Sequence, residues 1–218
     1  MKKSIFALGA LSLAAIFGTV SVSSAHVWDK KGYAQLKNDS QYFQHAKSAR
    51  AKIGQQFPYF AVQTLDGKGL TKGSFKNKIG LFVLADTTCP CVQANEERLR
   101  AISNKYAKHG LRVAYIFSMP KEKPLQIGRF MANHQLPWPA MLDQNQVLLR
   151  MLNGKCSSEV YLMDKKGVLR YHGRVDDSTF DPKKVKTRDL ENAILSVVQG
   201  RRVAKTFAPA IGCAIPRI

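Results

Sequence analysis

The sequence lacks the features of the common nucleotide-dependent and hydrolytic enzymes. It contains no glycine-rich nucleotide-binding loop, no Ser/His/Asp arrangement and no cluster of carboxylates. Hydride transfer and hydrolysis are therefore unsupported. Acidic residues are scarce as well, because 15 Asp and Glu stand against 34 Lys and Arg, which gives a formal net charge of +19.

The excess of basic residues is spread along the chain. They occur singly or in pairs, as at residues 30–31, 165–166, 183–184 and 201–202. This spacing favours a solvated basic surface that repels other copies of the protein, and we predict no nucleic-acid partner. Attraction to an anionic membrane face or to acidic partners is the alternative.

Long hydrophobic runs are also scarce, and the one present is N-terminal. Lys2 and Lys3 precede a mostly apolar run from Ile5 to Val22, and small residues follow up to Ala25. This is the pattern of a secretory signal peptide with cleavage after Ala25. A retained membrane anchor is the alternative, but the glycine, serine and threonine in the run make it weakly apolar for a spanning helix.

The rest of the chain is predicted to be a polar, lysine-rich extension over residues 26–52 and one domain over residues 53–218. No later stretch is long and apolar enough to span a bilayer. We therefore expect a periplasmic or otherwise exported protein with no transmembrane anchor after removal of the signal.

Cysteine is infrequent, with four residues, Cys89, Cys91, Cys156 and Cys213, all in the predicted mature protein. In an oxidising compartment they can form disulfides. Four cysteines allow three complete pairings, and the sequence alone does not choose among them.

Apolar runs of strand length alternate with segments of helical periodicity. We predict strands near residues 60–65, 81–85, 113–117, 136–143, 160–163 and 168–171, and helices over 90–109, 122–134, 147–152 and 188–199. Such alternation indicates an α/β fold with helices on both faces of a central sheet. The late hairpin adds antiparallel strands, so the sheet should be mixed.

The most informative motif is Cys89-Pro90-Cys91, which follows the buried strand at residues 81–85 and opens a helix. Proline is favoured at the first helical position, which makes Cys89 the N-cap and Cys91 the second helical residue. Free backbone N–H groups and the positive helix end favour a thiolate, the reactive form of cysteine. Cys89 and Cys91 are therefore the candidate catalytic residues.

With this motif in place, the chain resembles the thioredoxin-like redoxin family, in the branch related to alkyl hydroperoxide reductase and thiol-specific antioxidant proteins. The resemblance covers roughly residues 53–215, and its last two segments, residues 173–177 and 212–213, resemble exported bacterial redoxins more than cytosolic thioredoxin. It implies a thioredoxin-like fold and redox activity. It is carried by residues 60–67, 81–91, 136–143, 159–164 with Gly167, 173–177, and 212–213.

The chain departs from the family at three points. A thioredoxin has two residues between its cysteines and this chain has one, so a Cys89–Cys91 disulfide would be strained and more oxidising. Ser158 stands where the family places a cis-proline. The peroxidase branch has a threonine three residues before its reactive cysteine; Thr88 fits relative to Cys91, whereas Asp86 holds that place relative to Cys89.

The leading hypothesis is thiol–disulfide exchange with protein thiols. Cys89 would attack a substrate disulfide, and Cys91 or Cys213 would resolve the mixed disulfide. Cys156 and Cys213 are candidates for a resolving role or for a second, structural disulfide. Such a catalyst needs no metal or organic cofactor, but it needs a redox partner to reset it.

Two alternatives remain open from the sequence. A thiol peroxidase would oxidise Cys89 or Cys91 to a sulfenic acid and condense it with another cysteine. A binding protein for a soft metal such as Cu(I) would use the two thiolates of the Cys-x-Cys motif.

Overall fold

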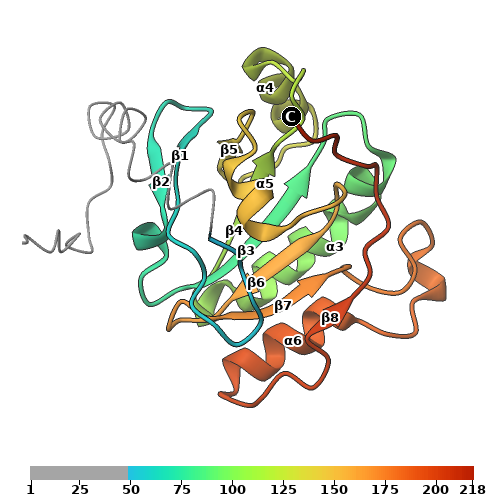
Figure 1. Ribbon diagram of the computed structural model, residues 1–218. Coiled ribbons are helices and arrows are strands. Elements are labelled where there is room, and N and C mark those ends of the chain that lie inside the picture. Colours follow the sequence, from blue (N-terminus) through green and yellow to red (C-terminus); the bar gives the residue numbers. More distant parts are fainter. Residues whose placement is uncertain (1–48) are drawn as a thin grey trace, which may run out of the picture.

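A computed structural model describes residues 49–218 of the protein (Figure 1). The predicted signal peptide, residues 1–25, and most of the predicted extension, residues 26–52, lie outside the described residues. Across residues 49–218, no helix is long and apolar enough to cross a membrane.

The fold is built on one mixed eight-stranded sheet with the order β2-β1-β5-β4-β3-β6-β7-β8. Its centre is parallel, with β3 beside β4 and β4 beside β5, while β6 pairs antiparallel with β3 and β7 pairs antiparallel with β6. The strands are β1 (Ala61–Thr64), β2 (Gly69–Thr71), β3 (Ile79–Ala85), β4 (Leu111–Phe117), β5 (Ala140–Leu142), β6 (Val160–Met163), β7 (Leu169–Gly173) and β8 (Phe207–Ala208).

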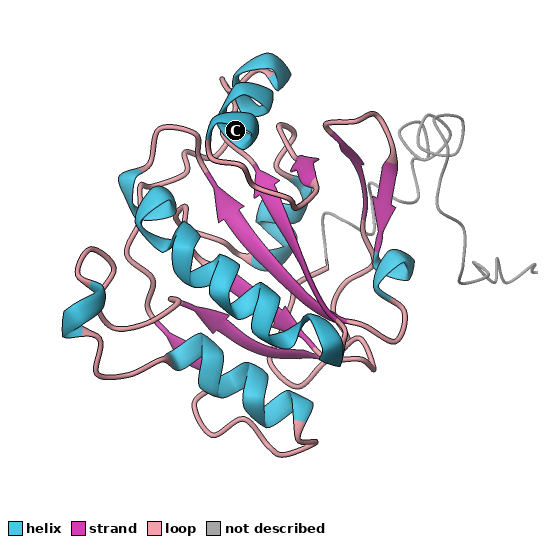
Figure 2. Cartoon of the chain, turned by 180° about the vertical axis from the view of Figure 1, so that it is seen from behind, coloured by secondary structure: helices cyan, strands magenta, loops and turns pink. Residues whose placement is uncertain are grey.

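Helices cover both faces of this sheet, as the sequence predicts. On one face, α3 (Pro90–Tyr106), α4 (Pro124–Asn133) and α6 (Asp189–Val198) share a hydrophobic core with alternate residues of β3 and β4. α3 and α6 lie in front of the sheet in Figure 2. On the other face, α5 (Val147–Leu152) packs with the remaining residues of the same strands. Short 3₁₀ turns lie at η1 (Lys72–Phe75), η2 (Ala107–His109) and η3 (Pro182–Lys184).

Sequence patterns account for the central elements. All seven residues of β3 are buried, as expected for a strand covered on both faces. Pro90 occupies the first position of α3 with Cys89 as N-cap. Gly110 has φ 88°, the left-handed conformation that ends a helix and favours glycine, and it follows η2 directly. The predicted boundaries of α5 and β6 match the structure at both ends.

The C-terminal region differs most from the predicted pattern. β8 has two residues and pairs in parallel with β7, which places an edge strand where no strand was predicted. From β8 the chain, red in Figure 1, runs back past the start of α3 toward α4. This return brings the last residues of the chain to the end of the sheet where α3 begins.

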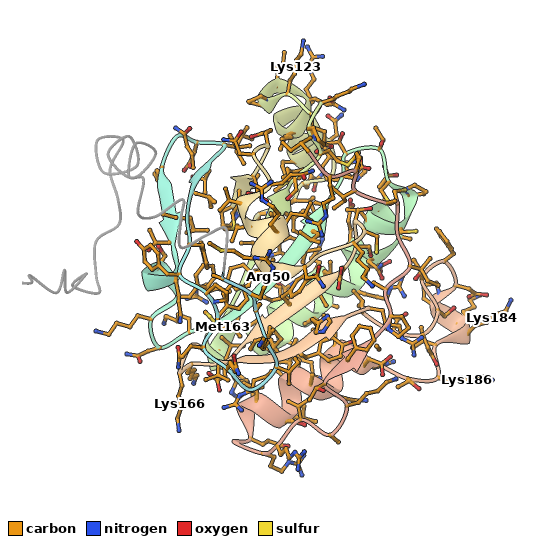
Figure 3. The ribbon with its side chains drawn as sticks, viewed as in Figure 1. Arg50, Lys123, Met163, Lys166, Lys184 and Lys186 are labelled. Atoms are coloured by element: carbon orange, nitrogen blue, oxygen red, sulfur yellow. The ribbon has the colours of Figure 1, made fainter. Side chains whose placement is uncertain are left out.

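Basic side chains lie on several sides of the molecule. Lys123 and Lys166 point outward at separate edges in Figure 3, and Lys184 and Lys186 point outward together at a third. Exposed basic side chains are thus present on more than one side of the part of the chain that the structure describes.

Candidate active site

The loop between β3 and α3 holds Cys89 in place. The Asp86 carboxylate accepts hydrogen bonds from the backbone N–H and the hydroxyl of Thr88, each at 2.8 Å. The Cys89 N–H donates to the Asp86 carbonyl at 3.2 Å. Cys89 has extended backbone angles, φ −80° and ψ 117°, and α3 begins at the next residue. Its side chain is fully buried, with 0% exposure.

Glu122 supports the same loop from the segment before α4. Its Oε1 accepts a hydrogen bond of 2.6 Å from the Thr87 N–H, and its side chain is buried. Burial raises the pKa of Glu122, although the Thr87 hydrogen bond opposes that effect. Sequence periodicity placed Glu122 inside the predicted helix 122–134, but α4 begins at Pro124 and leaves Glu122 free to reach the loop.

The Cys89 sulfur is surrounded by hydrogen-bond donors. Burial by itself raises the pKa of Cys89. The Cys213 thiol, the Ser157 hydroxyl and the backbone N–H groups of Cys213 and Val92 outweigh burial, so the pKa lies below its usual value. The Cys213 N–H lies 3.4 Å from Cys89 Sγ. The site therefore stabilises the thiolate form of Cys89 more than the surroundings of an ordinary cysteine do.

Cys91 has a different environment although it is two residues away. Its side chain is buried, and its pKa is raised first by that burial and then by the charge of Cys89 and a hydrogen bond to it. The Cys91 carbonyl accepts a 2.9 Å hydrogen bond from Asn95 Nδ2, which also donates to Ser158 Oγ at 2.7 Å. Cys91 is thus a thiol held by the first turn of α3.

Ser158 fills the position just before β6 where the family places a cis-proline. Its peptide bond is trans and its φ is +69°, the left-handed region. The Ser158 N–H donates to the Leu84 carbonyl at 2.7 Å, and its hydroxyl lies 3.4 Å from the Cys91 carbonyl. Ser158 therefore joins the end of β3 to the start of α3 through hydrogen bonds that a proline ring at this position does not provide.

The structure brings Cys213 to Cys89 across most of the chain. The Ser157 N–H donates to the Cys213 carbonyl at 2.9 Å, and the Cys213 N–H lies 3.1 Å from Ser157 Oγ. The pKa of Cys213 is raised to about 11, chiefly by its hydrogen bond to Cys89, then by burial and by the charge of Cys89. All four cysteines are free thiols in the structure.

Cys156 lies on the segment that precedes Ser157, and its sulfur faces the Ala210 carbonyl at 4.0 Å. Burial raises its pKa to about 11. Of the two candidates for a resolving role, Cys213 is thus the one hydrogen-bonded to Cys89. Within residues 49–218, no group of three or more His, Cys, Asp and Glu side chains is arranged to hold a metal ion.

Three residues of this site were not singled out from the sequence: Ser157, Asn95 and Glu122. Ser157 adjoins the position of the family's cis-proline, and that proximity is the signal that could have found it. Asn95 lies one helical turn after Cys91, on the same face of α3. No local pattern distinguishes Glu122 from an ordinary helical glutamate.

A sheet of this topology, with a cysteine pair at the start of the helix that follows its central strand, defines a thioredoxin-like redox protein. The Redoxin family model matches residues 52–213. The chain belongs to the Redoxin family, and thiol-dependent oxidoreductase activity is the function of that class.

Solved structures agree with this fold. A hypothetical protein from Sinorhizobium meliloti 1021 has a TM-score of 0.69 and 28% identity, over 77% of this chain and 95% of that chain. An uncharacterized conserved protein from Geobacillus kaustophilus has a TM-score of 0.68 and 23% identity, over 75% of this chain and 91% of that chain.

A secreted Mycobacterium tuberculosis disulfide oxidoreductase, described as homologous to Escherichia coli DsbE, has a TM-score of 0.50 and 14% identity, over 63% of this chain and 95% of that chain. No curated protein matches the sequence.

Proposed function

We propose that the protein is an exported thiol–disulfide oxidoreductase that exchanges disulfides with protein thiols, with Cys89 as nucleophile and Cys213 as resolving cysteine. The observation that carries the proposal is the contrast among neighbouring sulfurs. The pKa of Cys89 lies below its usual value, while those of Cys91 and Cys213 lie above it. Of the three sulfurs, Cys89 is therefore the one that its surroundings shift toward the thiolate form.

In the first step the Cys89 thiolate attacks one sulfur of a substrate disulfide. A bond forms between Cys89 Sγ and that sulfur, and the other substrate sulfur leaves as a thiolate that takes a proton from solvent. The product is a mixed disulfide between the protein and its substrate.

In the second step the Cys213 thiolate attacks Cys89 Sγ, forms a Cys89–Cys213 disulfide and releases the substrate sulfur as a thiolate. The raised pKa of Cys213 has its largest cause in the hydrogen bond to Cys89, and the charge of Cys89 contributes too. Both effects disappear once Cys89 is in a mixed disulfide. The Cys213 pKa then falls, and Cys213 becomes nucleophilic at the stage where a nucleophile is needed.

Cys91 is the less suitable resolving residue. The largest cause of its raised pKa is burial, which the mixed disulfide does not remove. A Cys89–Cys91 bridge would also close across a helical first turn with unfavourable geometry. A separate redox partner would then reduce the Cys89–Cys213 disulfide and reset the protein.

The apolar N-terminal run followed by small residues up to Ala25 supports export. The similarity in fold to a secreted disulfide oxidoreductase is consistent with an extracytoplasmic site of action. The test is secretion of the full chain fused to a reporter that is active only outside the cytoplasm, with residues 2–25 deleted as the control.

The activity is tested by mixing the reduced protein with a protein disulfide and mapping the products by mass spectrometry. We expect a Cys89–Cys213 disulfide and two released substrate thiols per protein oxidised. A parallel reaction with hydrogen peroxide and a thiol donor tests the peroxidase alternative. Peroxide consumption without disulfide exchange would overturn the proposal.

A further inference from the structure

The segment between β8 and Ile215 crosses the candidate active site. Ala208, at the end of β8, is fully buried, and Ile215 is buried in the hydrophobic core on the α5 face. The residues between them, 209–214, are all exposed or half-buried. We call residues 209–214 the strap, because it is anchored at both ends and covers Cys89 in between.

The strap is held by backbone pairing with the segment before β6. The Ser157 N–H donates to the Cys213 carbonyl at 2.9 Å, and the Ile215 N–H donates to the Lys155 carbonyl at 3.1 Å. Cys156 and Ala214 form the antiparallel bridge between these two bonds. Any extended polypeptide can make such bonds, because they use only backbone groups.

The strap also presents its own cysteine to the nucleophile. The N–H of Cys213 is directed at Cys89 Sγ, 3.4 Å away, and its thiol donates to the same sulfur. In this geometry the strap holds a cysteine where the attacked sulfur of a substrate would have to lie. Because Cys89 is fully buried, a protein disulfide reaches it only after this segment moves.

We propose that the strap is an autoinhibitory segment: it occupies the backbone edge of residues 155–157, and it must leave this edge before a protein disulfide can reach Cys89. The inference rests on the proposed function and adds the regulation of access to its site. The absence of fully buried side chains in the strap makes its opening a local event of low cost. Because the strap is anchored at Ala208 and Ile215, Cys213 stays near Cys89 after the strap opens. Cys213 therefore has a high effective concentration for resolving the mixed disulfide.

Gly212 allows the strap to lie close to the backbone of Ser157. A Cβ atom on Gly212 would overlap the carbonyl group of Ser157. Gly212→Ala should therefore lift the strap without removing any thiol. Gly128→Ala, on α4, is the matched control, because its Cβ would make an ordinary 3.5 Å contact with Leu65.

The first experiment measures alkylation of Cys89 by iodoacetamide in full-length protein with the other three cysteines changed to serine. The rate is taken at the high-pH plateau, where Cys89 is fully thiolate and differences in its pKa do not contribute. We expect Gly212→Ala to raise the plateau rate by about tenfold or more, since reaction in the parent must wait for local opening. Gly128→Ala should leave it unchanged. Equal rates in Gly212→Ala and the parent, with both folded by circular dichroism, would overturn the proposal that the strap limits access to Cys89.

The second experiment needs no change at Gly212. In the same three-serine protein, Cys89 is joined in a mixed disulfide to a short cysteine peptide or, as control, to cysteamine, and amide hydrogen exchange is measured. With the peptide, the Ile215 amide should lose protection, because the strap has left residues 155–157. If the Ile215 amide stays protected in the peptide adduct, then Cys89 has reacted while the strap has stayed on residues 155–157, which contradicts the proposed displacement. Failure of Cys89 to form either adduct would instead count against the proposed function. The alkylation rates would still show whether the strap limits access to Cys89.

Discussion

The start of α3 and the strap both place a cysteine at the same point, but they do so with very different support. Cys89 follows a strand with seven buried residues, and the loop before it is fixed by Asp86 and by the buried Glu122. Cys213 lies in a segment without a fully buried residue, paired with its neighbour by a few backbone hydrogen bonds. The proposed nucleophile, Cys89, therefore lies in a well-supported loop, and its candidate resolving partner lies in a segment with much less buried support.

The two sulfurs also differ in acidity, and the difference follows from the same contacts. The hydrogen bond that the Cys213 thiol donates to Cys89 lowers the pKa of Cys89 and raises that of Cys213. The strap therefore helps to activate the residue that it covers. The contact between Cys213 and Cys89 thus affects both the acidity of Cys89 and the access of substrate to it. Separate experiments are needed to measure the two effects.

The largest effect is expected from the fixed cysteine. Cys89→Ser should lower the rate of protein disulfide exchange by about 10³-fold or more, because the attacking thiolate is lost. Cys156→Ser is the matched control and should retain nearly full activity, since its raised pKa of about 11 keeps it protonated near neutral pH. The measurement is the initial rate of disulfide reduction at fixed reductant. If Cys156→Ser were the inactive variant, the assignment of the nucleophile would be wrong.

The next effect separates the two candidate resolving cysteines. Cys213→Ser should accumulate the mixed disulfide and lower turnover by about 10- to 100-fold, because no thiolate is available to release the substrate. Cys91→Ser should lower it less. Quenched-flow trapping followed by mass spectrometry gives the amount of mixed disulfide in each variant. Accumulation in Cys91→Ser but not in Cys213→Ser would show that the resolving step occurs within the Cys89-Pro90-Cys91 motif.

The extent to which the sequence predicts this site follows the same division between the two regions. The N-cap position of Cys89 follows from local rules: a buried strand, a proline suited to the first helical position, and helical periodicity after it. The contact between Cys89 and Cys213 spans 124 residues. It depends on a two-residue strand, β8, whose sequence has no period to detect. The sequence therefore left the partner of Cys213 open between Cys89 and Cys156.

The role of Ser157 shows a second limit. A serine at this position does not by itself predict a role in the site. Its hydroxyl forms hydrogen bonds with Cys89 and Cys213 only because the fold brings these two distant residues next to it. Resemblance to the family drew attention to Ser158 next to it, where the cis-proline is missing. The structure explains that difference through the left-handed φ of Ser158 and its hydrogen bond to the Leu84 carbonyl.

The third effect compares the thermodynamic support of the two regions. Asn95→Ala removes two hydrogen bonds from a buried amide and should lower the free energy of unfolding by about 1–3 kcal/mol. The value should lie toward the lower end, because the Asn95 amide oxygen is buried without a partner and its removal is favourable. Ile211→Ala in the strap should change the same quantity by less than ~0.5 kcal/mol, since Ile211 is 60% exposed. Urea unfolding of both variants checks the contrast, and equal losses would mean that the strap is as well packed as α3.

The smallest effect is on the acidity of Cys89. Its alkylation rate should rise with pH as the thiolate forms, with a midpoint lower than that of an ordinary cysteine. Ser157→Ala removes a donor that lowers this pKa, so the midpoint should move to higher pH and the rate at pH near 7 should fall severalfold. The control is Ser196→Ala, because the Ser196 hydroxyl donates to the Asn192 carbonyl within α6, away from Cys89. Superimposable pH profiles for Ser157→Ala and the parent would mean that the helix start alone sets the acidity of Cys89. A higher plateau without a shifted midpoint would mean that Ser157 acts by holding the strap, which separates access from acidity at this site.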